Sequence, residues 1–431
     1  MTARVLRYAA IVTIGLCLAL LREAVAADTV ELTIDARLGF AAPEIEGNVA
    51  IRWQNPGPEP ARSIELLLFA NRFRSIDGMD DLARHFLVAD GSYRAGGTEL
   101  VAVEENGSAL AWRYETVPAM PEATIARIDL GRELRVGEEA RVSVQFRTRL
   151  PNLLDTLGAT GNLLIAAEGW YPQPVQGGNH CPSRALAHAR LTIPPGSQLL
   201  LDGKRFDGGA PIEDTTEGQV SFVLSGEPFV ERSLRVGARA VRVYAAPSDE
   251  FAHRISRNEE ALDALVGTLP AVLEKSKASE ELTIVRLPLH WYPSAAVTGM
   301  VLVSDRLFEI FPVLRPLHQR ELAYAIFLEE ERGAAETREP GADADWVAEG
   351  LAWRRADELY RTQFRSGREV KDWIRLFNIF AIVDRFDTAP RIPLVRPFYP
   401  MTASEDPLRI RLAGLCDPRP PGRLLFGKLE S

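Results

Sequence analysis

The stretch Ser63–Phe73, SIELLLFANRF, is apolar over a continuous run, whereas the segments before it alternate. Asp28–Leu38 (DTVELTIDARL) and Glu46–Asn55 (EGNVAIRWQN) place apolar and polar residues in turn. Alternation is typical of a strand with one face on a core, and a continuous run is typical of a strand buried on both faces. Together these segments predict a sandwich or a curved multi-sheet module.

More strand-like segments follow along the chain. They include TIARIDL, ARVSVQFRTRL, ALAHARLTIP, QVSFVLSG and ARAVRVYAAP. Gly, Pro, Asn and Asp residues separate them at short intervals, as expected for connected strands. We therefore predict an N-terminal all-β domain over residues 28–240.

The pattern changes near Pro247, where helical segments begin to alternate with short strands. A chain of 431 residues is long enough for two or three domains. We predict an α/β domain over residues 247–431, and thus an α+β fold class for the whole chain. The expected helices are 248–276 with Ser248 or Asp249 as N-cap, 315–331, 345–361 with Asp345 as N-cap, and 370–384; the expected strands are 281–288 and 297–305, with a loop at 334–343 and an irregular tail from Thr388.

The first 26 residues have the pattern of a secretory signal peptide. Arg4 and Arg7 precede an apolar run over Ala9–Leu21, and Ala24–Ala26 supplies the small residues of a cleavage site. The run is short for a membrane span. We expect a secreted or periplasmic protein without a stable membrane span beyond this signal; the alternative is an uncleaved N-terminal membrane anchor.

The net charge bears on the kind of binding partner, and the cysteines bear on disulfide bonds. The net charge is −9 and no long basic run occurs, which excludes nucleic acid as an expected partner. Cys181 and Cys416 remain after removal of the signal. In an oxidising compartment they are able to pair, and the alternative is two lone thiols.

Four segments occur in an order that resembles a known enzyme family. They are LLLFANRF (66–73), AAEGWYPQP (166–174), RELAYAIF (320–327) and WVAEGLA (346–352). Together they resemble segments of the gluzincin zinc aminopeptidases, the family of membrane alanyl aminopeptidase and leukotriene hydrolase. The resemblance implies an N-terminal sandwich-like β module, then a truncated thermolysin-like α/β domain of the catalytic type, without the C-terminal helical domain of many members.

In that family two histidines of an H-E-x-x-H helix bind zinc, and the glutamate between them acts as general base. A glutamate of the next helix is the third ligand. The resemblance puts Arg320 and Tyr324 at the histidine positions, Glu321 at the general base and Glu349 at the third ligand. A guanidinium has no free lone pair for a metal, so Arg320 cannot be a ligand.

Three other residues are candidates for the cleft. Gly299 and Met300 fall where the family has its peptide-anchoring G-x-M-E-N loop, although no Glu follows them here. His318 lies three residues before Glu321, and His318, Glu321 and Glu349 together are a candidate for a relocated zinc site. Otherwise His318 is a surface residue at the start of a helix.

We therefore expect a non-catalytic homologue that needs no cofactor and keeps a cleft for a peptide or an envelope protein. The alternatives are an active zinc aminopeptidase with an atypical ligand set and a structural envelope component. Arg320 is expected to form a forked bond to Glu349, with Glu321 or the Tyr324 hydroxyl as a further partner; otherwise it points to solvent.

Overall fold

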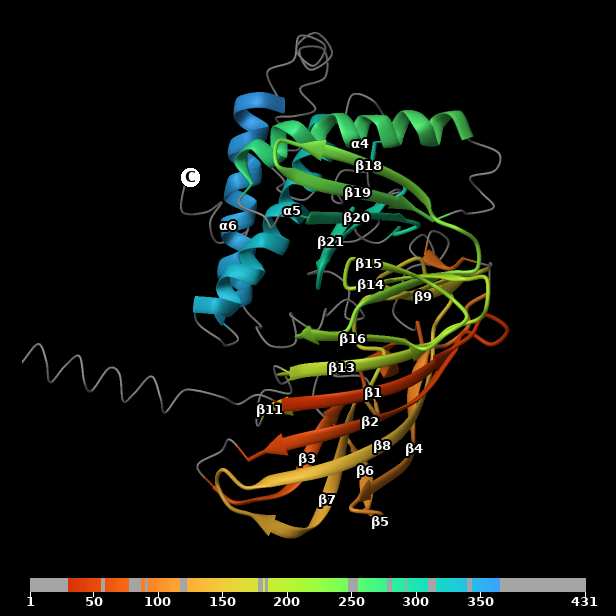
Figure 1. Cartoon of the computed structure of the whole chain (residues 1–431). Helices are drawn as coiled ribbons and strands as arrows, with labels where there is room; N and C mark the ends of the chain where they lie inside the picture. Colours follow the sequence, from red (N-terminus) through yellow and green to blue (C-terminus); the bar gives the residue numbers. More distant parts are fainter. Residues whose placement is uncertain are drawn as a thin grey trace, which may run out of the picture.

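The structure is a computed structural model and describes residues 30–55, 59–76, 87–89, 92–116, 122–176, 181–182, 185–246, 255–276, 281–290, 293–308, 315–338 and 343–364. It is a mixed fold, mostly sheet with few helices (Figure 1). Within these residues no helix is both long and apolar enough to cross a membrane. The expected signal peptide, the caps Ser248 and Asp249, the helix at 370–384, the tail and Cys416 lie outside the described residues.

The largest sheet has seven strands in the order β16-β13-β1-β2-β8-β4-β5. Only β1 and β13 run parallel, and the other neighbours are antiparallel. Burial alternates along β1, as the sequence predicts. The strands are β1 (Val30–Leu38), β2 (Glu44–Gln54), β4 (Gly97–Glu105), β5 (Ser108–Ala109), β8 (Glu139–Arg149), β13 (Ala185–Thr192) and β16 (Ile212–Glu217).

Two five-stranded antiparallel sheets accompany it. The first has the order β15-β14-β17-β10-β9, with β9 (Leu157–Thr160), β10 (Leu163–Ala166), β14 (Gln198–Leu201), β15 (Lys204–Asp207) and β17 (Phe222–Ser225). The second has the order β12-β11-β3-β7-β6, with β3 (Ala61–Leu67), β6 (Trp112–Glu115), β7 (Ile125–Leu134), β11 (Gln173–Gln176) and β12 (Cys181–Pro182).

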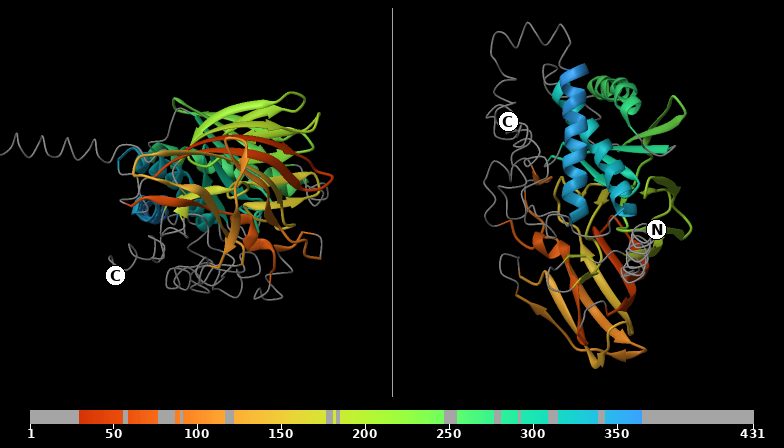
Figure 2. Two further views of the ribbon diagram at one scale, coloured as in Figure 1. Left: turned by 90° about the horizontal axis from the view of Figure 1, so that it is seen from below. Right: turned by 90° about the vertical axis from the view of Figure 1, so that its left-hand side faces the viewer.

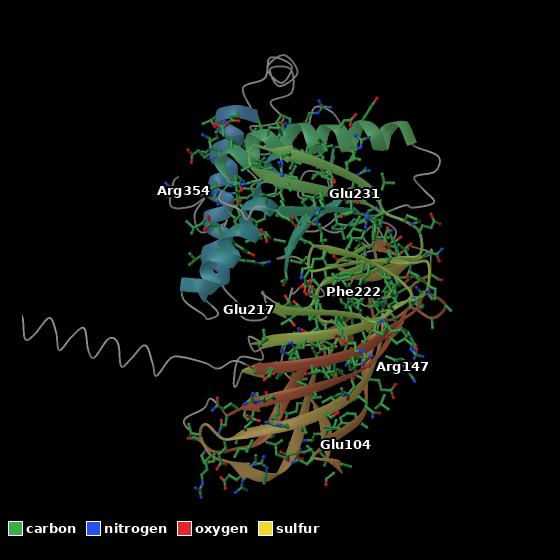
Figure 3. All side chains as sticks on the ribbon, in the orientation of Figure 1. Glu104, Arg147, Glu217, Phe222, Glu231 and Arg354 are labelled. Carbon is green, nitrogen blue, oxygen red and sulfur yellow. The ribbon has the colours of Figure 1, made fainter. Side chains whose placement is uncertain are left out.

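One hydrophobic core joins these three sheets, which we call the β part. It contains residues of each sheet, such as Ile34, Leu66 and Leu199. Trp170 is fully buried in it and packs edge-on against Phe222, with ring centroids 5.2 Å apart. The Trp170 indole N–H donates to the carbonyl of Val220 at 2.8 Å, so its polar group is satisfied. Phe222 lies within the dense group of side chains in Figure 3.

The remaining sheet and three helices form the helix-bearing part. The sheet order is β18-β19-β20-β22-β21, and β19, β20 and β22 are parallel neighbours. Its elements are β18 (Val230–Val236), β19 (Arg239–Ala245), α4 (Ile255–Lys275), β20 (Glu281–Leu287), β21 (Ser294–Val297), β22 (Met300–Ser304), α5 (Arg315–Arg338) and α6 (Asp343–Leu359), followed by a short π-helical turn, η3 (Tyr360–Phe364). Helix α4 connects the parallel strands β19 and β20 and lies along β18 and β19 in Figure 1.

Strand β22 of this sheet is buried on both faces. Along β22, Val301 and Val303 face the helices, whereas Met300 and Leu302 face the β part. Because side chains alternate across a strand, a strand covered on both faces is apolar throughout. The five residues of β22 are accordingly all buried.

Five elements differ from the sequence prediction in their bounds or their placement. The run Ser63–Phe73 is a strand only to Leu67, and Phe69–Phe73 form the 3₁₀ turn η1. The side chain of Asn71 requires this turn, because it bonds the carbonyl of Ala123 and the N–H of Thr98. The expected strand at 297–305 is instead the hairpin β21–β22, whose turn uses Gly299 at φ 68°.

The other three differences concern the second half of the chain. Val230–Val236 pairs with the fourth sheet, although the sequence analysis grouped it with the β domain at 28–240. Helix α5 continues to Arg338 through part of the expected loop, and α6 begins at Asp343 rather than at a cap on Asp345. Ala, Glu and Arg, which are good helix formers, fill that end of α5 and outweigh Gly333.

The two parts meet at a pair of facing turns. The turn Asp202–Gly203 joins β14 to β15, and a Cβ on Gly203 would lie 2.4 Å from the Gly299 carbonyl oxygen. The Thr283 hydroxyl donates to the Gly203 carbonyl at 2.9 Å. Elsewhere along the junction the His290 N–H donates to the Leu154 carbonyl at 2.8 Å.

We predict that Gly203→Ala destabilises the fold more than Gly196→Ala. Both glycines have φ 81°, but no atom lies within 4 Å of a Cβ on Gly196. The shared backbone strain costs about 1–2 kcal/mol, and the clash with Gly299 adds about 1–3 kcal/mol at residue 203 alone. Urea unfolding of both variants measures the difference, and equal stabilities would show that the turns do not touch.

Candidate functional site

The candidate residues lie on an antiparallel pair of helices, α5 and α6, which stand side by side in Figure 2. Ion pairs on the later part of α5 fix how the two helices align. Arg355 of α6 donates to Glu331 at 2.6 Å and to Glu330 at 3.0 Å. Its guanidinium carbon also lies 4.0 Å from the centre of the Phe327 ring. The earlier residues of α5 therefore face the later residues of α6 and η3.

Arg320 is buried between these helices, with 5% of its surface exposed. The guanidinium carbon lies 4.5 Å from the centre of the Trp353 ring and 5.2 Å from that of Tyr360. The nearest carboxylates are Glu321, 3.6 Å from Nη2, and Asp357, 4.0 Å from Nη1. These distances are too long for hydrogen bonds, and in the part of the chain that the structure describes the Nε atom has no hydrogen-bond partner. Two aromatic faces and two carboxylates thus surround one buried cation.

The prediction for the surroundings of Arg320 was wrong in one respect. Arg320 does not point to solvent, but within the described residues it makes no ion pair with Glu349. Asp357 takes that place because Arg320 and Asp357 lie at similar distances from the connection between antiparallel helices. Glu349 lies much nearer that connection, and so it is level with a later turn of α5.

The other candidates on the helix pair have separate surroundings. Tyr324 is half-buried, and its ring meets Trp353 edge-on with centroids 5.8 Å apart. Glu321 is close to Arg320, and its carbonyl oxygen lies 3.4 Å from the Ser294 hydroxyl of β21. Glu349 is half-buried and makes no hydrogen bond or ion pair in the part of the chain that is described.

His318 is not a surface residue, contrary to one expectation. It is 5% exposed, and its Nδ1 accepts a hydrogen bond from the Phe308 N–H at 3.1 Å. Burial, and to a smaller extent the charge of Arg315, lowers the pKa of His318 to about 4. The imidazole is therefore neutral near pH 7. It holds the turn at Phe308, which has φ 70°, against the start of α5.

Gly299 and Met300 belong to the junction between the two parts. Gly299 is exposed at the β21–β22 turn and faces Asp202. Met300 is 1% exposed in the apolar cluster between the fourth sheet and the β part. Burial to this degree leaves Met300 little surface for a ligand.

The residues around Arg320 do not fit a zinc ion. The buried guanidinium occupies the space between Glu321, Asp357 and the two rings, and a divalent cation there would meet a fixed positive charge. His318 already uses Nδ1 as an acceptor. Among the described residues no three His, Cys, Asp or Glu side chains gather as a possible metal site.

Sequence reasoning missed Trp353, Asp357 and Tyr360 as neighbours of Arg320. A signal for two of them was present. In an antiparallel helix pair, residues equally far from the connection face each other, and the predicted helix ends already put Arg320 opposite the Trp353–Asp357 region. The resemblance to the family predicted Glu349 as the partner of Arg320 instead.

Comparisons with known proteins gave distant structural likenesses. No protein-family model matches the chain, and no curated protein matches its sequence. The M1 zinc metallopeptidase from Deinococcus radiodurans is similar with a TM-score of 0.43 and 14% identity, over 82% of this chain and 74% of that one. A mutant of a two-domain M1 zinc metallopeptidase bound to L-arginine is similar with a TM-score of 0.40 and 15% identity, over 74% of each chain. Values this low do not assign an activity to this chain.

We predict that Arg320→Met lowers the free energy of unfolding by about 3–5 kcal/mol, because Glu321 and Asp357 lose the cation between them. Arg354→Met is the control, since Arg354 is an exposed arginine on α6 (Figure 3). The control should stay within about 0.5 kcal/mol of the unsubstituted chain. Chemical denaturation measures the free energy of unfolding of both variants. An equal loss in both would contradict the claim that Arg320 compensates the carboxylates of Glu321 and Asp357.

The His318 imidazole makes stability depend on pH in the acid range. Its pKa is lower in the folded chain, so the folded state is favoured above the unfolded value of 6.5 and loses this advantage as the pH falls towards 4. The loss amounts to about 3 kcal/mol. In His318→Gln this part of the acid destabilisation should vanish.

His188→Gln is the matched control for that measurement, because His188 has an exposed side chain on β13. Unfolding free energies between pH 4.5 and pH 7 should change alike in this control and in the unsubstituted chain. An unchanged pH dependence in His318→Gln would mean that His318 is not held neutral by burial.

Proposed function

We propose that this protein is a non-catalytic relative of the zinc aminopeptidases that works outside the cytoplasm and binds a peptide or a protein partner. Its β part corresponds in this proposal to the family's sandwich-like N-terminal module, and its helix-bearing part to a truncated thermolysin-like domain. The order of the four family-like segments and the signal-like first 26 residues support it.

One observation carries the non-catalytic assignment: the buried guanidinium of Arg320 stands where the resemblance expects a zinc-binding imidazole. Arginine stays protonated at all physiological pH values and offers no lone pair. The Glu321 carboxylate lies beside this cation instead of beside a metal-bound water. Peptide hydrolysis by the family's route therefore has neither its Lewis acid nor a free general base.

Binding does not need these missing groups. Glu349 keeps a half-buried carboxylate that makes no hydrogen bond or ion pair in the described part of the chain. Such a carboxylate is able to accept hydrogen bonds from an ammonium or guanidinium group of a bound peptide. In this proposal the contacts of Arg320 with Glu321, Asp357 and the two aromatic rings hold the helix pair and β21 in position. The binding surface lies beside these elements.

Metal content and hydrolysis together test the proposal. The exported chain is purified without chelator, its zinc is measured, and the release of aminoacyl p-nitroanilides is followed with and without added zinc. We expect far less than one zinc per chain, no release above background, and no change of the melting temperature with EDTA. Stoichiometric zinc together with EDTA-sensitive release would establish the active enzyme instead.

A separate fractionation distinguishes a soluble binding protein from a structural envelope component. The proposal expects the native protein in the soluble extracytoplasmic fraction, together with a partner that salt or a competing peptide releases. Recovery only with sedimented envelope, resistant to salt, would favour the structural component.

A further inference from the structure

The facing turns between the two parts contain a half-buried acid, Asp202, whose Oδ2 atom is buried. Asp202 and Gly203 form the two-residue loop between Leu201 and Lys204, with φ 46° and 81°. Positive φ at both positions is typical of the Asp-Gly type I′ hairpin. The Asp202 carbonyl oxygen would lie only 2.5 Å from a Cβ on Gly299. We call these two turns, Asp202–Gly203 and Thr298–Gly299, the clasp.

The carboxyl group of Asp202 is incompletely bonded. Its Oδ1 accepts a hydrogen bond from the Ser221 N–H at 3.2 Å, and the Thr216 side chain is a further donor. Its Oδ2 is buried and has no hydrogen-bond partner among the described residues. A buried carboxylate oxygen without a partner is costly when charged and much less so when the group is neutral.

The surrounding charges do not compensate a carboxylate at this place. Lys204 is the nearest cation, but its ammonium already bonds both oxygens of Asp214, at 2.8 and 2.9 Å. Asp214 itself repels a second negative charge. From the helix-bearing part, the residues that contact this turn, Thr283 and Gly299, are uncharged.

We propose that the clasp is a pH-dependent contact between the β part and the helix-bearing part, seated while Asp202 is neutral and loosened when Asp202 ionises. An ionised Asp202 gains solvation when the turn moves its carboxyl group away from Ser221 and from the buried position of Oδ2. Because Gly203 and Gly299 touch through their backbones, the turn cannot move without leaving Gly299 and the Thr283 hydroxyl. The hairpin β21–β22 then loses its support from the β part.

The pH window follows from the burial. Burial raises the pKa of Asp202 to about 7, from 3.8 in an exposed aspartate. Between these values the folded chain holds a proton that the unfolded chain has released. The contact is therefore strongest in mild acid, weakens as the pH rises towards 7, and changes little further once Asp202 is ionised in both states.

Hydrogen exchange on the full chain tests this proposal. Exchange of the peptides that cover 198–207 and 294–304 is compared at pH 5.5 and pH 8, after correction for the intrinsic exchange rates. In the unsubstituted chain we expect protection to fall about thirtyfold at pH 8, because the contact loses about one decade per pH unit between pH 5.5 and the folded pKa of about 7. Asp202→Asn, which stays neutral, should keep its protection at both pH values.

Asp207→Asn is the matched control, because Asp207 is an exposed carboxylate on the same hairpin. It should lose protection at pH 8 as the unsubstituted chain does. Equal corrected protection of the unsubstituted chain at both pH values would overturn the proposal. So would a loss in Asp202→Asn as large as that in Asp207→Asn.

Discussion

The buried cation Arg320 constrains the pair of helices α5 and α6. Arg320 has left water almost completely, and a charge in that position must be compensated by its neighbours. Glu321 and Asp357 supply the opposite charge, and the rings of Trp353 and Tyr360 supply aromatic faces. Each neighbour belongs to a different turn of the helix pair. Their simultaneous contact with one guanidinium, together with the ion pairs of Arg355, therefore fixes how α5 and α6 align.

This constraint reaches the rest of the molecule through packing. Helices α5 and α6 cover one face of the fourth sheet, and the β part covers the other. A shift of α5 would move Arg332, whose guanidinium bonds the Ala296 carbonyl of β21 at 2.8 Å. Strand β21 in turn forms the hairpin that ends at Gly299, against Asp202. The helix pair and the junction between the two parts thus share one structural element.

The sequence predicted elements where local pattern and packing agree. The alternation at Asp28–Leu38 and the start of the helix at Arg315 were both predicted. The sequence prediction failed where a contact between residues far apart in the chain determines the local structure. Ser63–Phe73 looks like one strand until the Asn71 amide, bonded to distant backbone, bends it. Arg320 was identified as the unusual residue, but its partners depend on helix register, which a resemblance to segments does not contain.

The coupling energy between Arg320 and Asp357 tests the central claim most directly. A double-mutant cycle with Arg320→Met and Asp357→Asn, measured with and without added zinc, isolates the pair from the bond that Asp357 also makes to Arg361. The account predicts a favourable coupling of about 1–3 kcal/mol that zinc does not change. A coupling near zero, or one that disappears when zinc binds, would contradict it.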